Sequence, residues 1–422
     1  MKIQLAFFAS KRYWNDDAKL QQAYGRMKDD LSGLSQQAAL ILEEADVENA
    51  LQGGDCLVVV PMSGAVQRMI LAAAGRYRTV VLYPAYIQGN AGKEQEDEML
   101  KNNAAPTTMD CWAVLRRTHE HVCIALNKTE LDKCVRVFRA YNAMQGATLL
   151  LIGNTEPWVI SNSADLTQYE KLGVKIRQIE QEEVAQLYRS LSDDAGAEYY
   201  SYFKGDEKET VEPTDADVKA SCRMAAALIQ ITEKYNADGI ALACFNLLAE
   251  GTNCCLGVSY MNDCTRYIAS CEGDVDSAVT MLAMKQLANT KLWMANPGIH
   301  PDGTINFSHC TAPLSMYDNK KCTYTLRNHH ESGIGTSLQV EYPVGSKVTA
   351  CRISDNAEKM TVQTGVTLTG EYEGACRTQV YVKFDDFNRY LDTALGCHQV
   401  FAFEDIADEM RMLGKQLKLE IL

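Results

Sequence analysis

Acidic residues beside glycines form the part of this sequence best suited to chemistry. Glu250-Gly251 follows an apolar run at 239–245, and Glu272-Gly273-Asp274 precedes an apolar, helical stretch at 277–287. Open α/β sheets bind their ligands at the carboxyl ends of the strands, so acids placed there are candidates for a site. Each acid also has a plain structural interpretation: Asp274 as a helix cap and Glu250 as a solvated loop acid.

Histidines supply the second kind of candidate ligand. His309 ends an alternating run that begins at Ile305, and His398 precedes an apolar stretch. For either one, a buried histidine with a hydrogen-bond partner is the ordinary interpretation. Two carboxylates joined by one or two imidazoles would suit a divalent metal, and a set of oxygen and nitrogen ligands favours Mn²⁺, Co²⁺ or Mg²⁺ over structural zinc. The spacing of these residues does not by itself establish such a set.

The elements that must position these residues follow two different patterns. Up to about residue 290, short apolar runs alternate with amphipathic stretches, which predicts open parallel sheets. The predicted strands are 3–9, 56–61, 79–83, 147–152, 174–179 and 239–245; the predicted helices are 18–44, 63–74, 182–191 and 214–235, with a surface loop at 193–215.

Beyond residue 290 the apolar runs become short and alternating. Strands at 336–342, 347–353, 359–368 and 378–384 predict an antiparallel meander that closes into a barrel, followed by a helix at 403–417. The predicted fold class is α/β, with two N-terminal open parallel-sheet (Rossmann-like) domains at 1–153 and 154–267. A C-terminal antiparallel β-barrel-like domain with a terminal helix completes the chain at 268–422.

Composition excludes several functional classes. Asp plus Glu number 55 and Lys plus Arg number 41, which gives a net charge of −14. So acidic a chain is poorly suited to nucleic acid or to an anionic membrane, and no apolar run reaches the length of a membrane span. The 15 cysteines are scattered without a CxxC pair, which is typical of reduced thiols and predicts a cytoplasmic protein.

Several short segments resemble one enzyme family. Glu250-Gly251 together with 269–275 (ASCEGDV) resembles the metal-site segment of the L-fucose isomerase family. The segments 306–313 (NFSHCTAP), 328–335 (NHHESGIG) and 375–378 (ACRT) resemble its shorter, fucose-isomerase-like branch. Residues 396–400 (GCHQV) are similar to a late Gly-x-His segment shared with L-arabinose isomerases. The order of these segments between about 240 and 408 is what makes the resemblance specific.

This resemblance implies a metal-dependent aldose–ketose isomerase that acts on an open-chain sugar through an enediolate. It implies a divalent metal, usually Mn²⁺, and a homo-oligomer whose site lies near a subunit interface. Glu250 and Asp274 would be metal ligands that also act as the acid/base pair, His398 a further ligand, and His309 a ligand or a substrate contact. The candidates for contacts with sugar hydroxyls are Asn253, Glu331 and Arg377.

The resemblance leaves the substrate and even the reaction open. At 422 residues the chain is much shorter than a typical L-fucose isomerase, and the sugar could be another one, including sulfoquinovose. An epimerase or lyase could use the same site. A non-catalytic sugar-binding relative is the alternative from a different functional class.

Overall fold

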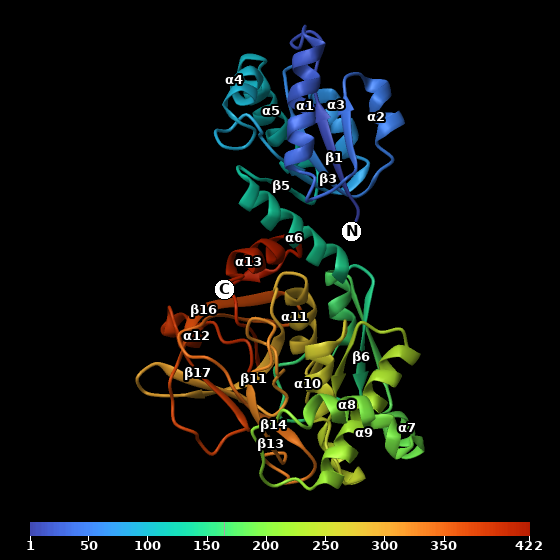
Figure 1. Ribbon diagram of the computed structural model, residues 1–422, viewed down its shortest axis with the longest axis vertical. Helices are drawn as coiled ribbons and strands as arrows, with labels where there is room; N and C mark the ends of the chain where they lie inside the picture. The colour runs from blue at the N-terminus through green and yellow to red at the C-terminus, as the bar shows by residue number, and fades with distance from the viewer. Residues whose placement is uncertain (164) are drawn as a thin grey trace. The chain divides into compact units, whose positions relative to one another are not determined.

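The structure is a computed structural model that describes residues 1–163 and 165–422. It contains two compact units, Met1–Asn142 and Ala143–Leu422. Each unit has its own parallel sheet, and the second unit also has an antiparallel barrel (Figure 1). The predicted fold class is therefore confirmed.

The first unit is built on five parallel strands in the order β2-β1-β3-β4-β5. The inner strands β1 (Ile3–Phe8) and β3 (Gly54–Pro61) are mostly apolar, as expected of strands that are covered on both faces. The other strands are β2 (Ala38–Ile41), β4 (Tyr77–Leu82) and β5 (Val122–Ile124), and the helices are α1 (Asp17–Asp30), α2 (Glu44–Ala50), α3 (Gln67–Ala74), α4 (Lys93–Lys101) and α5 (Ala104–Thr118).

The single helix predicted at 18–44 is wrong in its second half. Helix α1 ends at Asp30, and Ala38–Ile41 forms β2, which pairs in parallel with Leu5–Phe8 of β1. The ladder to a distant strand outweighs a local helical pattern, because helix propensity is a weak preference. Helix α6 (Lys128–Met144) then leads from the first unit into the second.

The second unit begins with a four-stranded parallel sheet in the order β10-β9-β6-β7. Its helix α9 (Asp215–Lys234) starts with a capping box, in which Thr214 and Asp217 accept each other's backbone N–H. The loop predicted at 193–215 instead contains a 3₁₀ helix, an α-helix and a short strand. The further elements are β6 (Ala147–Ile152), β7 (Val174–Ile179), β9 (Gly239–Leu242), β10 (Ile268–Cys271), α7 (Gln181–Ser190), α8 (Ala197–Phe203), α10 (Cys255–Cys264), α11 (Val275–Lys285), and the 3₁₀ helices η1 (Leu166–Leu172), η2 (Asp193–Gly196) and η3 (Phe245–Glu250).

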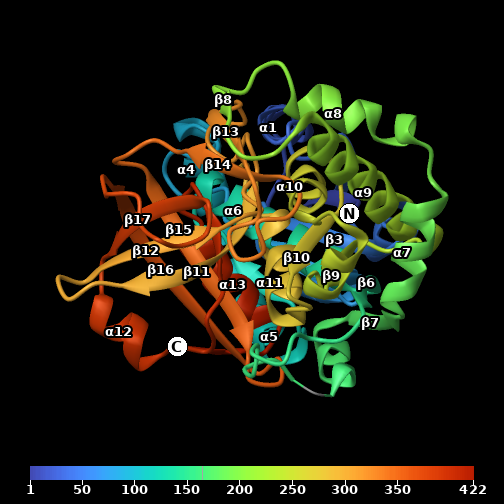
Figure 2. The same ribbon diagram turned by 90° about the horizontal axis from the view of Figure 1, so that it is seen from below.

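Six antiparallel strands close the barrel in the order β15-β18-β11-β12-β17-β16, and β16 pairs back to β15. Its core includes Phe307, whose ring centroid lies 4.4 Å from that of Phe401 and 5.7 Å from that of Phe384. Figure 2 shows the barrel strands beside the second parallel sheet, with α11 between them. The strands are β11 (Leu292–Ile299), β12 (Thr304–His309), β15 (Lys347–Ser354), β16 (Lys359–Leu368), β17 (Thr378–Phe384) and β18 (Gln399–Ala402).

Some elements lie outside the barrel. The strand predicted at 336–342 is β14 (Ser337–Glu341), and it belongs to a small separate sheet with β13 (Thr323–Arg327) and β8 (Glu209–Thr210). The terminal helix is present as α13 (Ala407–Gln416), followed by β19 (Glu420–Ile421) along β16, and α12 (Phe387–Asp392) follows β17.

The boundaries of the parallel sheets differ from the predicted ones. Strand β6 lies before the predicted boundary at 153, yet it pairs with β7 and β9 of the second sheet. Strand β10 lies after the predicted boundary at 267, yet it pairs with β9. Among the described residues, no helix combines the length and the apolar character needed to cross a membrane.

Candidate metal centre

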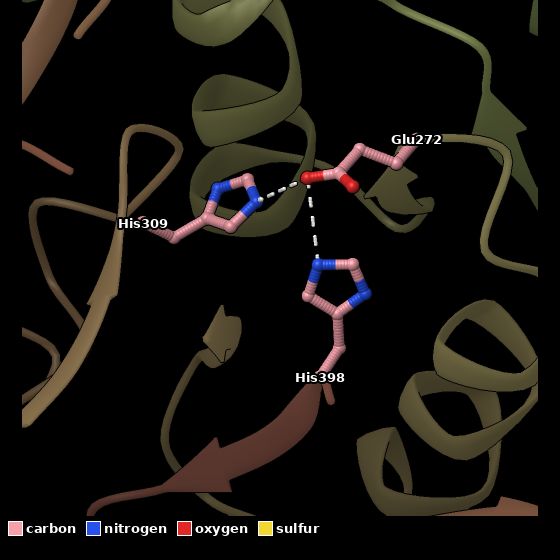
Figure 3. Close-up of side chains that lie close together, drawn as sticks. All are labelled: Glu272, His309 and His398. Atoms are coloured by element: carbon pink, nitrogen blue, oxygen red, sulfur yellow. Dashed lines mark ion pairs between the residues drawn. The ribbon is translucent and has the colours of Figure 1, made fainter. Parts of the chain in front are cut away.

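Three side chains from distant parts of the chain converge in the second unit: Glu272, His309 and His398 (Figure 3). Oε1 of Glu272 lies 3.7 Å from Nε2 of His309 and 3.4 Å from Nε2 of His398. One potential ligand atom from each residue lies within 4.8 Å of the others, so the three could hold one metal ion.

The barrel register brings the two histidines together. His309 ends β12 and His398 immediately precedes β18, and β11 lies between these two strands. On β11, Ala295 pairs with Gln399 and the next residue, Asn296, pairs with Ser308. The two histidines therefore flank β11 at nearly the same level, although 89 positions separate them in the sequence.

A left-handed turn at the end of β10 carries Glu272 to the histidines. Glu272 and Gly273 have φ values of 60° and 61°. A side chain at Gly273 would place its Cβ 2.7 Å from Cα of Thr155, so the close approach of these segments requires glycine. The backbone N–H of Glu156 donates to the carbonyl of Glu272 at 3.0 Å, which fixes the turn against the loop that follows β6.

Asp274 contacts His398 of the cluster through the ring nitrogen that does not face Glu272. It is fully buried and caps α11, because its Oδ1 accepts the backbone N–H of Ser277 at 2.8 Å. Its Oδ2 lies 2.7 Å from Nδ1 of His398 and accepts a bond from Nη1 of Arg352 at 3.0 Å. The helix cap considered for this acid is therefore present, while its assignment as a metal ligand and acid/base group stays a prediction.

A buried arginine links two carboxylates behind the cluster. Arg352 is fully buried on β15, and its guanidinium lies 3.0 Å from Asp274 and 3.4 Å from Asp276. Burial lowers the pKa of Arg352, but the two carboxylates raise it more, so the guanidinium stays charged. Burial raises the pKa of Asp276 to about 6, while Tyr169 and Ser354 donate hydrogen bonds to it.

The two nitrogens of His398 differ in their hydrogen-bond partners. Burial lowers the pKa of His398, but the bond to Asp274 and the contact with Glu272 outweigh burial and raise it well above its usual value. Burial likewise raises the pKa of Glu272, but His309 and His398 lower it more, so this carboxyl is held below its usual range. Among the described residues, the buried Nε2 of His398 has no hydrogen-bond partner. With Nδ1–H directed at Asp274, Nε2 is the nitrogen placed to bind a cation.

The structure does not bring Glu250 into this cluster. Glu250 ends η3, and both of its carboxylate oxygens accept hydrogen bonds from Arg189 on α7, with Nε of Arg189 at 2.9 Å from Oε2. Its assignment as a metal ligand and acid/base group stays a prediction. The structure places an arginine, and not a histidine, against it.

The three residues predicted to contact the sugar either lie in the loop between β13 and β14 or form hydrogen bonds with it. Glu331 lies in this loop, and its carboxylate is 3.5 Å from Nε2 of His329. Asn253 is buried and donates to the carbonyl of Ile334 at 2.8 Å. Arg377 donates to the backbone and side-chain oxygens of Asn328, with Nε 3.0 Å from the carbonyl. Asn253 and Arg377 therefore hold the loop, and Glu331 is the most exposed of the three.

The sequence analysis assigned no individual role to three residues of this arrangement. Glu272 stands inside the motif that drew attention to Asp274, and a helix cap is easier to read from sequence than a left-handed turn. Arg352 lies in an alternating strand that carries no motif. Trp158 lies in the turn segment GNTEPW, and its indole N–H donates to Oε2 of Glu272 at 2.7 Å.

Comparisons with known proteins add no assignment: no protein-family model matches the chain, and a search of curated proteins finds no match.

Proposed function

We propose that this chain is a metal-dependent aldose–ketose isomerase that acts on an open-chain sugar, with Glu272, His309 and His398 as the metal ligands. The observation that carries the proposal is the convergence of these three side chains, with ligand atoms within 4.8 Å of one another. The resemblance of the segments around them to the L-fucose isomerase family supplies the reaction.

The donor set suits a divalent cation. One carboxylate and two imidazoles form a donor set that several divalent transition-metal ions accept, and the resemblance to the isomerase family selects Mn²⁺ among them, with Co²⁺ or Mg²⁺ as alternatives. The buried Nε2 of His398 has no hydrogen-bond partner within the described ranges, and a cation is the partner that would satisfy it. When bound, such a cation polarises the carbonyl and the neighbouring hydroxyl of a sugar and stabilises the charge that develops between them.

The remaining residues orient the ligands. Asp274 accepts the Nδ1 proton of His398 and thereby fixes the ring with Nε2 toward Glu272. Arg352 neutralises Asp274 and fixes its position. Since Asp274 is fully buried and bonded to Ser277, Arg352 and His398, it fits a positioning role better than the proton-transfer role predicted from sequence.

The proton transfer between C1 and C2 still requires an acid/base group. Glu250, with a side chain that is 13% exposed, stays the candidate for that step. Both oxygens of its carboxylate accept hydrogen bonds from Arg189, which fixes the position of this side chain.

A ketose assay with added Mn²⁺ tests the proposal. The aldoses are L-fucose, D-arabinose, L-arabinose and sulfoquinovose, each with a chelator control. We expect chelator-sensitive ketose formation from at least one sugar and its loss in Glu272→Gln. Epimerisation without ketose would indicate the related reaction at the same site. A protein that binds no Mn²⁺ and forms no ketose would overturn the proposal.

A further inference from the structure

Trp158 is the tryptophan with the most exposed side chain, and it contacts the candidate metal centre. Trp14 and Trp293 are buried and Trp112 is half-buried, whereas Trp158 is 51% exposed. Its one polar atom, Nε1, lies 2.7 Å from Oε2 of Glu272. A hydrogen bond this short to a carboxylate is of the stronger, charge-assisted kind.

The loop that carries Trp158 is fixed on both sides of this residue. Before it, Oγ1 of Thr155 donates to the carbonyl of Gly273 at 2.9 Å, next to the backbone bond from Glu156 to Glu272. After it, Arg352 donates to Ser161 and to Asn162, at 3.1 and 3.2 Å. Arg352 therefore contacts both this loop and Asp274.

The indole ring is also held from the side. Phe245, in η3, meets it edge to face, with 4.8 Å between ring centroids and 82° between ring planes. Edge-to-face contact is a favourable aromatic geometry. The loop bonds place the N–H at Glu272, and the aromatic contact packs one edge of the indole ring.

This contact separates the two oxygens of Glu272. Oε1 faces Nε2 of both histidines, at 3.4 and 3.7 Å, and Oε2 accepts the indole N–H. A carboxylate can bind a cation through one oxygen or through both. In Glu272, Oε2 already accepts a hydrogen bond from the indole N–H of Trp158, which the loop bonds hold in place.

We propose that Trp158 is a positioning residue that keeps Glu272 a one-oxygen metal ligand and so leaves three coordination positions, enough for two sugar oxygens and one water molecule. This inference rests on the proposed metal centre and concerns how many positions remain open there. Three single-atom protein ligands leave three positions of a six-coordinate ion such as Mn²⁺, whereas a two-oxygen Glu272 leaves two.

Trp158→Phe tests this role, because it removes the N–H and keeps a ring against Phe245. The measurement is the water-proton relaxation enhancement of Mn²⁺ bound to the protein, which reports the water molecules on the ion. We expect the enhancement to fall by about one third in Trp158→Phe, from three water positions to two. Phe245→Leu is the matched control, since it alters the same aromatic contact but leaves the donor to Glu272, and its enhancement should equal that of the wild type.

Equal enhancement in wild type and Trp158→Phe would overturn the inference. Loss of Mn²⁺ binding by a Trp158→Phe protein that remains folded, as judged by urea unfolding, would also overturn it, because the indole would then be needed for binding itself. Ketose formation is scored separately. A wild type that binds Mn²⁺ but forms no ketose refutes the proposed reaction, while the relaxation comparison still decides the role of Trp158. A wild type that binds no Mn²⁺ overturns both.

Discussion

The substitution Asp274→Asn tests the logic of the candidate centre most directly. Oδ2 of Asp274 accepts bonds from Arg352, Ser277 and His398, and Oδ1 accepts the backbone N–H of Ser277. An asparagine has one oxygen and one NH₂ group in place of the two oxygens. In either orientation, the NH₂ group faces a donor, so at least one hydrogen bond is lost along with the charge.

We expect Asp274→Asn to lower both the unfolding free energy and the metal affinity. Breaking a fully buried ion pair by removing one partner costs about 3–5 kcal/mol of unfolding free energy. Asp274 and Arg352 both have fully buried side chains, but the amide keeps some of the bonds, so we expect a loss near 3 kcal/mol. The metal affinity falls by about 10- to 100-fold, as it does when a carboxylate that orients a metal-binding histidine is removed.

Asp276→Asn is the matched control. Asp276 is buried beside the same arginine and accepts bonds from Tyr169 and Ser354, but it does not contact a residue of the candidate metal site. Its pKa of about 6 makes loss of its charge less costly than loss of the Asp274 charge. We expect a smaller loss of stability and a metal affinity within about threefold of the wild type, given that this acid lies outside the layer that orients the ligands.

Urea unfolding gives the stability of each variant and calorimetric titration with Mn²⁺ gives the affinity. The reasoning is refuted if the two variants lose metal affinity equally. It is also refuted if Asp274→Asn is destabilised as expected and binds Mn²⁺ as tightly as the wild type, since Asp274 would then stabilise the fold without orienting His398.

Three further outcomes are expected. In the same calorimetric titration, Glu272→Gln should weaken Mn²⁺ binding at least about 100-fold, and Glu250→Gln should weaken it by less than about threefold. A larger loss of affinity in Glu250→Gln than in Glu272→Gln would favour Glu250 as the metal ligand, as the resemblance implies. The pKa of His398 is raised, and Mn²⁺ can bind only to an Nε2 that carries no proton, so the Mn²⁺ affinity should increase about tenfold per pH unit below that pKa. The proton released on binding is measured by titration in buffers of different ionisation enthalpy. An Mn²⁺ affinity that does not change with pH would contradict this expectation. Burial lowers the pKa of Lys285 to about 8, so the unfolded state binds more protons between pH 8 and about 10.5, and the unfolding free energy should rise with pH in that window. Lys285→Met should remove the rise, and its persistence would place the cause elsewhere.

The parallel sheets were predictable because buried strands are apolar throughout. The runs at 56–61 and 147–152 correspond to β3 and β6 within one or two residues. Strand β2 was not predictable, because its four residues lie in a helical pattern and form a strand only through pairing with β1. Strand order is likewise a long-range property, which is why the predicted boundary at 153 separates β6 from its partners.

The histidines of the site were visible in the sequence, but the reason for their meeting was not. His309 stood out at the end of an alternating run, and His398 stood out just before an apolar stretch. Their convergence depends on β11 lying between β12 and β18, and no pattern within either segment encodes that order. Arg352 carried no signal, because one charged residue in an alternating strand is normally interpreted as facing solvent.

The different roles proposed for Glu272 and Asp274, metal ligand and positioning residue, follow from which nitrogen of His398 each carboxylate contacts. The two acids are two residues apart, yet Glu272 approaches Nε2 and Asp274 contacts Nδ1 of the same ring. An extended or helical segment would not place them on opposite sides of one imidazole; the left-handed conformations of Glu272 and Gly273 do. A left-handed residue other than glycine costs about 1–2 kcal/mol, and such strain is retained where the surrounding contacts enforce it. At Glu272 those contacts come from Glu156 through its backbone and from Trp158 through its indole, so the loop after β6 directs one acid to the cation-binding nitrogen and leaves the other to orient the ring.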